Sequence, residues 1–158
     1  MNIPVIINGE KFIIQSACDT SLLSVLRKNK LINSKRGCED GICGSCTVLL
    51  EGKPVPSCQV PVVLAINKKI ETLEHFSKSE LYSDIMKGFN RAGIKLCGYC
   101  NSGKIFAAYS ILTAKEKPTR AKVEEQIAHL SCCCTDYNSL TNGILYAFEI
   151  HTKRLQTI

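Results

Sequence analysis

The sequence contains no tryptophan, and aromatic residues of all kinds make up only 6% of its 158 residues. This composition argues against a surface that stacks the bases of single-stranded nucleic acid. The formal net charge is +6, but the 20 Lys and Arg residues are spread along the whole chain. Because no basic cluster stands out, we expect no nucleic-acid partner.

Long apolar stretches are also missing. The longest, residues 60–66, has seven residues and includes Pro61, far below the roughly 18 that a membrane span needs. The first residues lack a basic segment, an apolar segment and a small-residue cleavage site, so we expect no secretory signal and a cytoplasmic location. In a reducing compartment, ten cysteines indicate metal or redox chemistry rather than structural disulfides.

The first half of the chain has the pattern of short strands. Two β-rich runs, 3–7 and 11–15, flank the turn signal Asn8-Gly9-Glu10 and predict a hairpin. A short helix is predicted after the capping residues 19–21. Further strands are predicted at 47–50 and 70–73, with a Gly- and Cys-rich loop over 33–46.

In the second half the apolar spacing lengthens to about four residues, which predicts helices. The change occurs near residue 76, so two domains are expected, 1–75 and 76–158. The expected helices are one capped by Ser77 with Glu80 and ending near Gly93, one through 105–112, one capped by Thr119, and one through 140–148.

The first group of cysteines lies in the glycine-rich loop and the segment after it. The spacing C-x4-C-x2-C is typical of plant-type [2Fe–2S] sites, and glycines at 37, 41 and 44 can adopt positive φ and turn backbone N–H groups toward sulfur. A zinc site fits less well, because zinc ribbons usually present two C-x2-C pairs. The predicted ligands of this first cluster are Cys38, Cys43, Cys46 and Cys58.

The second group of cysteines consists of Cys97-x2-Cys100 and the run 132–134. Alone, this set is ambiguous, since four thiolates could bind zinc or an iron–sulfur cluster, or form a redox dithiol.

Together, the two cysteine groups resemble the small iron–sulfur subunit of the molybdenum hydroxylases, the xanthine dehydrogenase, aldehyde oxidase and carbon monoxide dehydrogenase family. The resemblance covers nearly the whole chain and includes three segments beside the cysteines: 23–27, 71–74 and RGCEDGICGSCTV at 36–48. It implies an α+β protein with an N-terminal β-grasp ferredoxin-like domain and a C-terminal four-helix [2Fe–2S]-binding domain.

By this resemblance, the second cluster would be bound by Cys97, Cys100, Cys132 and Cys134 and would face the molybdenum cofactor. The chain would be the electron-transfer subunit of an oxidoreductase whose substrate site lies on another subunit. The expected partners are a large subunit that binds the molybdenum cofactor and a medium subunit that binds FAD.

The departures from the family pattern lie mostly around the second group. Leu96 stands where the family has Gln, so a hydrogen bond to the cofactor would be lost or replaced by backbone. Cys133 stands where the family has Arg, which removes a positive charge and should lower the potential of that cluster. These departures support an alternative: a ferredoxin-like redox or sensor protein with one [2Fe–2S] cluster and a zinc or dithiol second site.

Three further expectations concern single residues. Cys18 is expected to be a small, partly buried residue without a redox role. The three histidines, at 75, 129 and 151, share no spacing and are expected at the surface or at caps. Glu39 and Asp40, inside the cysteine loop, are expected to be solvated.

Overall fold

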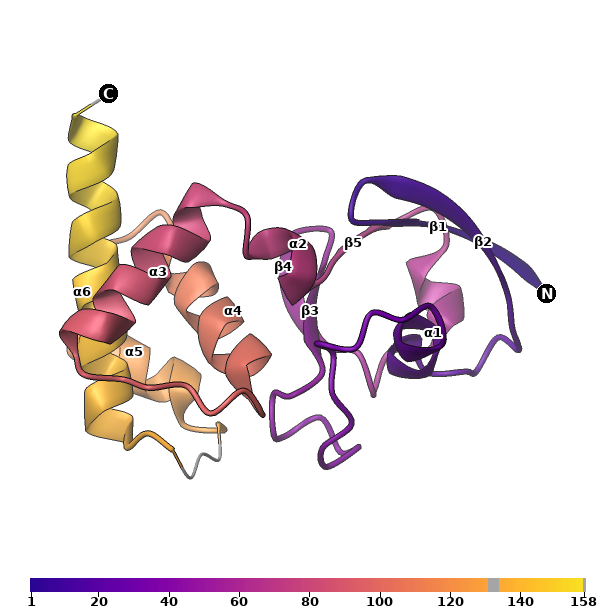
Figure 1. Ribbon diagram of the computed structural model, residues 1–158, viewed down its shortest axis with the longest axis horizontal. Helices are drawn as coiled ribbons and strands as arrows, with labels where there is room; N and C mark the ends of the chain where they lie inside the picture. Colours follow the sequence, from indigo (N-terminus) through magenta and orange to yellow (C-terminus); the bar gives the residue numbers. More distant parts are fainter. Residues whose placement is uncertain (131–133, 158) are drawn as a thin grey trace.

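The computed structural model describes residues 1–130 and 134–157. Figure 1 shows two lobes side by side along the long axis, a β lobe at the N-terminal end and a helical lobe at the C-terminal end. We define the β lobe as the five strands with helix α1 and the 3-10 helix η1, and the helical lobe as helices α2 to α6.

The β lobe is built on one mixed sheet in the order β2-β1-β5-β3-β4. Strands β1 and β5 are parallel and the other neighbours are antiparallel. The predicted N-terminal hairpin is confirmed: Asn8 and Gly9 both have positive φ, at 54° and 87°, which suits a two-residue turn that follows the twist of the strands. The strands are β1 (Asn2–Ile7), β2 (Glu10–Gln15), β3 (Thr47–Leu50), β4 (Lys53–Pro56) and β5 (Lys69–Glu71).

Helix α1 (Leu22–Lys28) begins at the predicted cap, because the Ser21 side chain accepts a hydrogen bond from the Ser24 N–H at 3.3 Å. Its apolar residues share one buried core with the sheet and with η1 (Val62–Ala65). The sheet with its packed helix is the expected ferredoxin-like half of the fold. The buried core residues are Ile3, Val5, Ile7, Ile14, Leu22, Val25, Leu26, Val48, Val62, Ala65 and Ile70.

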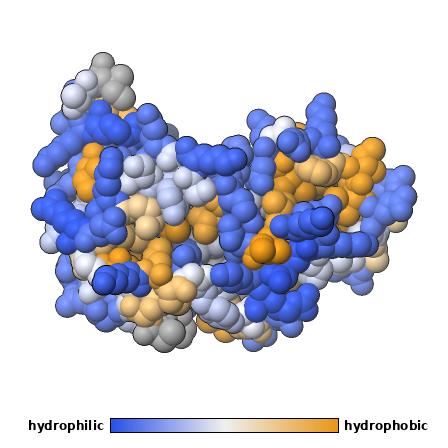
Figure 2. All heavy atoms as spheres, in the orientation of Figure 1, coloured by the Kyte–Doolittle hydropathy of each residue, from blue (hydrophilic) through white to orange (hydrophobic). Residues whose placement is uncertain are grey.

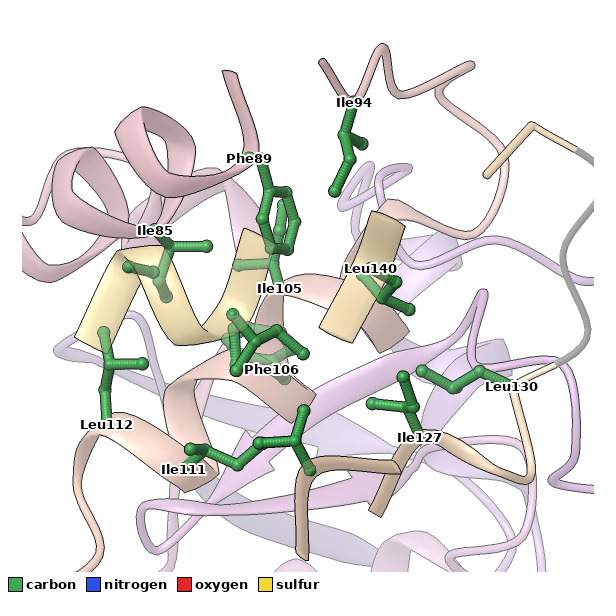
Figure 3. Packing of buried hydrophobic residues seen from close by; sticks show 14 of the residues in the cluster. Ile85, Phe89, Ile94, Ile105, Phe106, Ile111, Leu112, Ile127, Leu130 and Leu140 are labelled. Carbon is green, nitrogen blue, oxygen red and sulfur yellow. The ribbon is translucent and has the colours of Figure 1, made fainter. Parts of the chain in front are cut away.

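The helical lobe follows directly, with its own apolar core. Figure 3 shows side chains that meet in that core, among them Phe89, Phe106, Ile127 and Leu140. Each of these residues belongs to a different helix. The α+β fold expected from the sequence is therefore confirmed, with the sheet in the first half of the chain and the helical domain in the second. The helices are α2 (Leu73–Phe76), α3 (Glu80–Arg91), α4 (Asn101–Leu112), α5 (Arg120–Ile127) and α6 (Tyr137–Gln156).

Two glycines let α3 and α6 approach each other closely. A Cβ atom on Gly88 would lie 2.4 Å from the Ala147 nitrogen, and one on Gly143 would lie 3.0 Å from Phe89 Cδ1 of α3. A glycine inside α6 costs helix stability, but a side chain at this position would push into the core.

One predicted helix cap is wrong. The sequence predicts that Ser77 caps α3, but the cap is Ser79, whose Oγ accepts a hydrogen bond from the Tyr82 N–H at 3.1 Å. Ser77 instead ends α2 and donates to the Glu74 carbonyl. Ser77 cannot begin α3, because it follows directly on the last residue of the short helix α2 and is the C-terminal cap of that helix.

The two lobes are joined by packing as well as by the chain. Leu49 of β3 belongs to the helical core, and the Tyr109 hydroxyl of α4 donates to the Gly52 carbonyl at 3.2 Å. Figure 2 shows hydrophilic residues over most of this face of both lobes, with apolar residues in separate patches and a notch between the lobes. Among the described residues, no helix combines the length and apolarity that a bilayer crossing requires.

Candidate metal centres

The first cysteine group lies in the irregular loop between α1 and β3 and in the segment just after β4. In the loop, the Sγ of Cys38 accepts hydrogen bonds from the backbone N–H groups of Asp40 and Cys43, both at 3.3 Å. The Cys38 N–H in turn donates to the Sγ of Cys43 at 3.4 Å. The loop therefore holds Cys38 and Cys43 as a pair and turns backbone donors toward their sulfur atoms.

These backbone donors change the acidity of the first thiol. The N–H groups of Cys43 and Asp40 stabilise the thiolate and lower the pKa of Cys38 from its ordinary value of 9.0 to about 7. The thiolate is the form that binds metal. The Cys38 side of the loop is thus arranged to hold negative charge on sulfur.

Cys46 and Cys58 form a second pair. The Ser57 hydroxyl donates to the Cys46 carbonyl at 2.6 Å, which keeps the residue before Cys58 beside Cys46, and the two thiols interact. Burial raises the pKa of the Cys46 thiol to about 11. Metal coordination would offset this cost, because a coordinating thiol is deprotonated by the charge of the ion.

Two glycine positions explain how the loop turns. Gly41 and Gly44 have positive φ, at 79° and 74°, as expected from the sequence. The expectation for Gly37 is wrong, since it is not among the glycines with positive φ. Gly37 is instead needed for space: a Cβ there would lie 2.5 Å from Cys43 Sγ.

The first group fits a [2Fe–2S] cluster, which takes two protein ligands on each of its two irons. The four thiols already lie as two pairs. The buried Ser45 hydroxyl in the same loop has no hydrogen-bond partner among the described residues, and a cluster sulfur would supply an acceptor for it. Within residues 1–130 and 134–157, no three His, Cys, Asp or Glu side chains converge as ligands of a single metal ion.

The second cysteine group lies at the N-terminal end of α4 and just before α6. Cys100 is buried immediately before α4, and Cys97 is exposed in the preceding loop. Cys134 is half-buried two residues before Asp136, the cap of α6. The predicted ligand Cys132 and its neighbour Cys133 lie outside the described residues.

A buried lysine, which the motifs in the sequence do not predict, lies beside this second group of cysteines. Lys104 of α4 is 1% exposed, and its Nζ lies 3.1 Å from the Sγ of Cys134. A cation against a cysteine sulfur fits a site that carries net negative charge, as four thiolates around a [2Fe–2S] core do. No spacing rule connects the two partners of this contact, because 30 residues separate them.

The two groups are connected through backbone. Gly44, between Cys43 and Cys46, meets Gly103 of α4 so closely that a Cβ on Gly103 would lie 2.8 Å from the Gly44 Cα. The Lys35 ammonium of the β lobe also donates to the Gly98 carbonyl, between Cys97 and Cys100. The loops that carry the two cysteine groups therefore touch.

The exposure of other single residues near the cysteines agrees with the sequence-based expectation at some positions and differs at others. Glu39 and Asp40 are exposed, and Glu39 pairs with Arg36 at 2.7 Å. Cys18 is exposed rather than partly buried, because it lies outside the core in the turn after β2, near the Met1 sulfur. Leu96 packs against the helical core.

The histidines differ from one another. His75 pairs with Glu71 at the surface, as expected. His151 is not a surface residue: its Nδ1 lies 3.0 Å from Oδ2 of the buried Asp84, which also accepts a hydrogen bond from Arg154 Nε at 2.9 Å. This contact joins α3 to α6, so the role of His151 is to stabilise the packing of the helical lobe.

Comparison with known proteins agrees with this geometry. Residues 5–69 match the family described as "2Fe-2S iron-sulfur cluster binding domain", and residues 72–145 match "[2Fe-2S] binding domain". A protein with this fold, two cysteine groups and two such domains is a two-domain iron–sulfur protein of the electron-transfer class.

Whole-chain similarities define the family more narrowly. The chain is 35% identical over 141 residues to the xanthine dehydrogenase iron-sulfur-binding subunit of Escherichia coli O157:H7, covering 88% of this chain and 89% of that one. It is 32% identical over 148 residues to the nicotine 6-hydroxylase small subunit of Paenarthrobacter nicotinovorans, covering 93% and 89%. The chain belongs to the family of small iron–sulfur subunits of molybdenum hydroxylases.

A solved structure gives the same result. The fold matches a chain of quinoline 2-oxidoreductase from Pseudomonas putida 86 with a TM-score of 0.84 and 33% identity, covering 97% of this chain and 96% of that one. The relatives are subunits of oxidoreductases, and the chain is of the same electron-transfer type.

Proposed function

We propose that the chain binds two [2Fe–2S] clusters and conducts electrons between them. The first would be held by Cys38, Cys43, Cys46 and Cys58, and the second by Cys97, Cys100, Cys132 and Cys134. The observation that carries the proposal is the pairing of the loop thiols under backbone N–H donors, in a chain whose two halves both match [2Fe–2S]-binding families.

Each residue set has a definite task in this proposal. When bound, a [2Fe–2S] cluster supplies a one-electron carrier, whose potential depends on nearby charge, hydrogen bonds to sulfur and exposure. The loop around Cys38 holds the thiolates and directs N–H groups at sulfur. The contact of Gly44 with Gly103 holds the two centres close together, so that electrons can pass between them.

The proposed partners are a large subunit with a molybdenum cofactor and a medium subunit with FAD. Exposed apolar side chains lie beside both cysteine groups, Ile42 at 56% and Tyr99 at 53% exposure, and both would be covered by a partner surface. The helical lobe would lie against the molybdenum subunit and the β lobe toward the FAD subunit. A cytoplasmic location suits this role, since the ligands must remain reduced thiols.

Metal analysis after anaerobic purification tests the proposal. We expect about four irons and four acid-labile sulfides per chain, as two [2Fe–2S] clusters require, with two distinguishable EPR signals after reduction. Copurification with molybdenum- and flavin-containing subunits is expected from the native source. About two irons and one zinc per chain would favour the single-cluster alternative instead. Recovery of the chain without either partner would argue against its assignment as a subunit of a larger enzyme.

A further inference from the structure

Lys104 occupies an unusual position for a lysine. It is the fourth residue of α4, four residues after Cys100, and its side chain is among the largest fully buried ones in the protein. Lysine is almost never fully buried unless its charge is paired, because removing an ammonium from water is costly. The fold therefore has a specific reason to keep this group inside.

The contact that explains the burial is with a cysteine of the second group. The Nζ of Lys104 lies 3.1 Å from the Sγ of Cys134, which joins the N-terminal end of α4 to the segment that leads into α6. An ammonium has three donors and no acceptor, so the sulfur must be the acceptor. Such a bond is strongest when the sulfur is a thiolate, the form in which cysteine binds metal.

We infer that Lys104 is a positioning residue that raises the reduction potential of the second cluster through its contact with Cys134. The inference rests on the proposed function, because it requires a cluster on Cys97, Cys100, Cys132 and Cys134. Reduction adds one electron, taken from a low-potential reductant such as dithionite, and so adds one negative charge to the cluster. A fixed cation stabilises the reduced form more than the oxidised form.

The β lobe provides the contrast that makes the inference specific. Its loop directs neutral backbone N–H groups at Cys38, and none of its Lys, Arg, Asp or Glu side chains is buried in residues 1–72, all of which the structure describes. The cation next to sulfur is a feature of the second group, and removing it should affect one centre and not the other.

The test compares Lys104→Met with Lys104→Arg in the full chain loaded with both clusters. Met has a similar length and no charge, and Arg keeps the charge. Each protein is equilibrated with dithionite and redox mediators at a series of fixed potentials, and the two reduced EPR signals are followed separately. Lys122→Met removes an exposed lysine that pairs with Glu116 and serves as the matched control.

At the wild-type midpoint of the second cluster, we expect Lys104→Met to reduce the ratio of reduced to oxidised cluster about tenfold, which corresponds to a downward shift of about 59 mV for a one-electron couple. Lys104→Arg should retain most of the wild-type ratio, and the first cluster should keep its potential in every variant. If Lys104→Met does not retain four irons, Lys104→Gln, which keeps a donor without the charge, takes its place.

Two results would overturn the inference. The first is a ratio of reduced to oxidised second cluster in Lys104→Met that stays within twofold of wild type. The second is an equal fall of this ratio in Lys104→Arg and Lys104→Met, which would assign the effect to packing rather than charge. A wild-type chain with only two irons would instead contradict the proposed function. The iron content of the unmodified chain thus separates the two failures.

Discussion

The two lobes place their cysteines by different means. In the β lobe, an irregular loop with three glycines turns backbone N–H groups toward Cys38, and the buried polar residues Ser34, Ser45, Ser57 and Thr72 are all neutral. In the helical lobe, Cys100 lies immediately before α4 and Cys134 two residues before the cap of α6, and the charged side chains of Asp84 and Lys104 are buried. The comparison shows that one chain can stabilise charge near sulfur with the backbone or with a side chain.

This difference has a consequence for sequence variation. A loop that uses backbone donors depends on glycine positions, such as Gly37 and Gly44, where any side chain would collide. A site that uses a buried cation depends on one residue, Lys104, and on the packing that keeps it in place. Substitutions should therefore be able to change one centre and leave the other intact.

The largest effect is expected from removing one ligand of each centre. Cys43→Ala should lose the first cluster and keep the second, and Cys100→Ala should do the reverse, since the ligand sets share no residue. Each variant should retain about two of the four irons expected for two [2Fe–2S] clusters, measured by iron analysis and by the loss of one EPR signal. Cys18→Ala, at an exposed cysteine outside both groups, is the control and should keep all the iron. Loss of both signals in either ligand variant would show that the centres do not form independently.

The next largest effect concerns the buried carboxylate of the helical lobe. Asp84 is 1% exposed and accepts hydrogen bonds from Arg154 and His151 across the α3–α6 contact. Asp84→Ala should lower the free energy of unfolding by about 3 kcal/mol, because it removes the buried carboxylate that the Arg154 Nε and the His151 ring both contact. Urea unfolding followed by far-UV circular dichroism measures the loss.

Glu80→Ala provides the matched control for that measurement. Glu80 pairs with the same Arg154, at 2.5 Å, but its side chain is 80% exposed. Its removal should cost less than about 1 kcal/mol, as for surface ion pairs. Equal losses in the two variants would mean that burial adds nothing to the α3–α6 contact.

Local signals in the sequence predicted much of the fold. The Asn8-Gly9 turn and the caps at Ser21 and Thr119 are all present, because each depends on neighbouring residues. The cap at Ser77 was wrong because two serines two residues apart offer similar signals, and only the short helix α2 decides between them. The spacing of Cys38, Cys43 and Cys46 likewise predicted a compact site, since three of its ligands come from one loop.

Contacts between distant residues could not be predicted in this way. The replacement of Arg by Cys133 suggested a second site without a nearby cation, yet Lys104 reaches Cys134 from 30 residues earlier. His151 and Asp84 are 67 residues apart, and no spacing rule connects them. The first pair depends on how α4 lies against the segment before α6, and the second on how α3 packs against α6. The pattern of apolar residues in each helix does not determine either arrangement.

The smallest effect tests the contact between the lobes. Gly103→Ala should favour α4 by about 1 kcal/mol through helix propensity alone. Its Cβ, however, would lie 2.8 Å from the Gly44 Cα, and backbone cannot rotate away as a side chain can. Overpacking of about 1–3 kcal/mol should outweigh the gain, leave a net loss of about 1 kcal/mol, and move the two cysteine groups apart.

Gly143→Ala separates a general loss of stability from an effect on electron flow. It also places a methyl group inside a helix, against Ile94 Cδ1 at 2.7 Å and Phe89 Cδ1 at 3.0 Å, but entirely within the helical lobe. Both variants should therefore unfold at lower urea concentration. Only Gly103→Ala should slow electron equilibration between the two centres, measured by EPR on samples frozen at intervals after partial reduction. If the two variants slow it equally, the Gly44–Gly103 contact has no special part in holding the centres together.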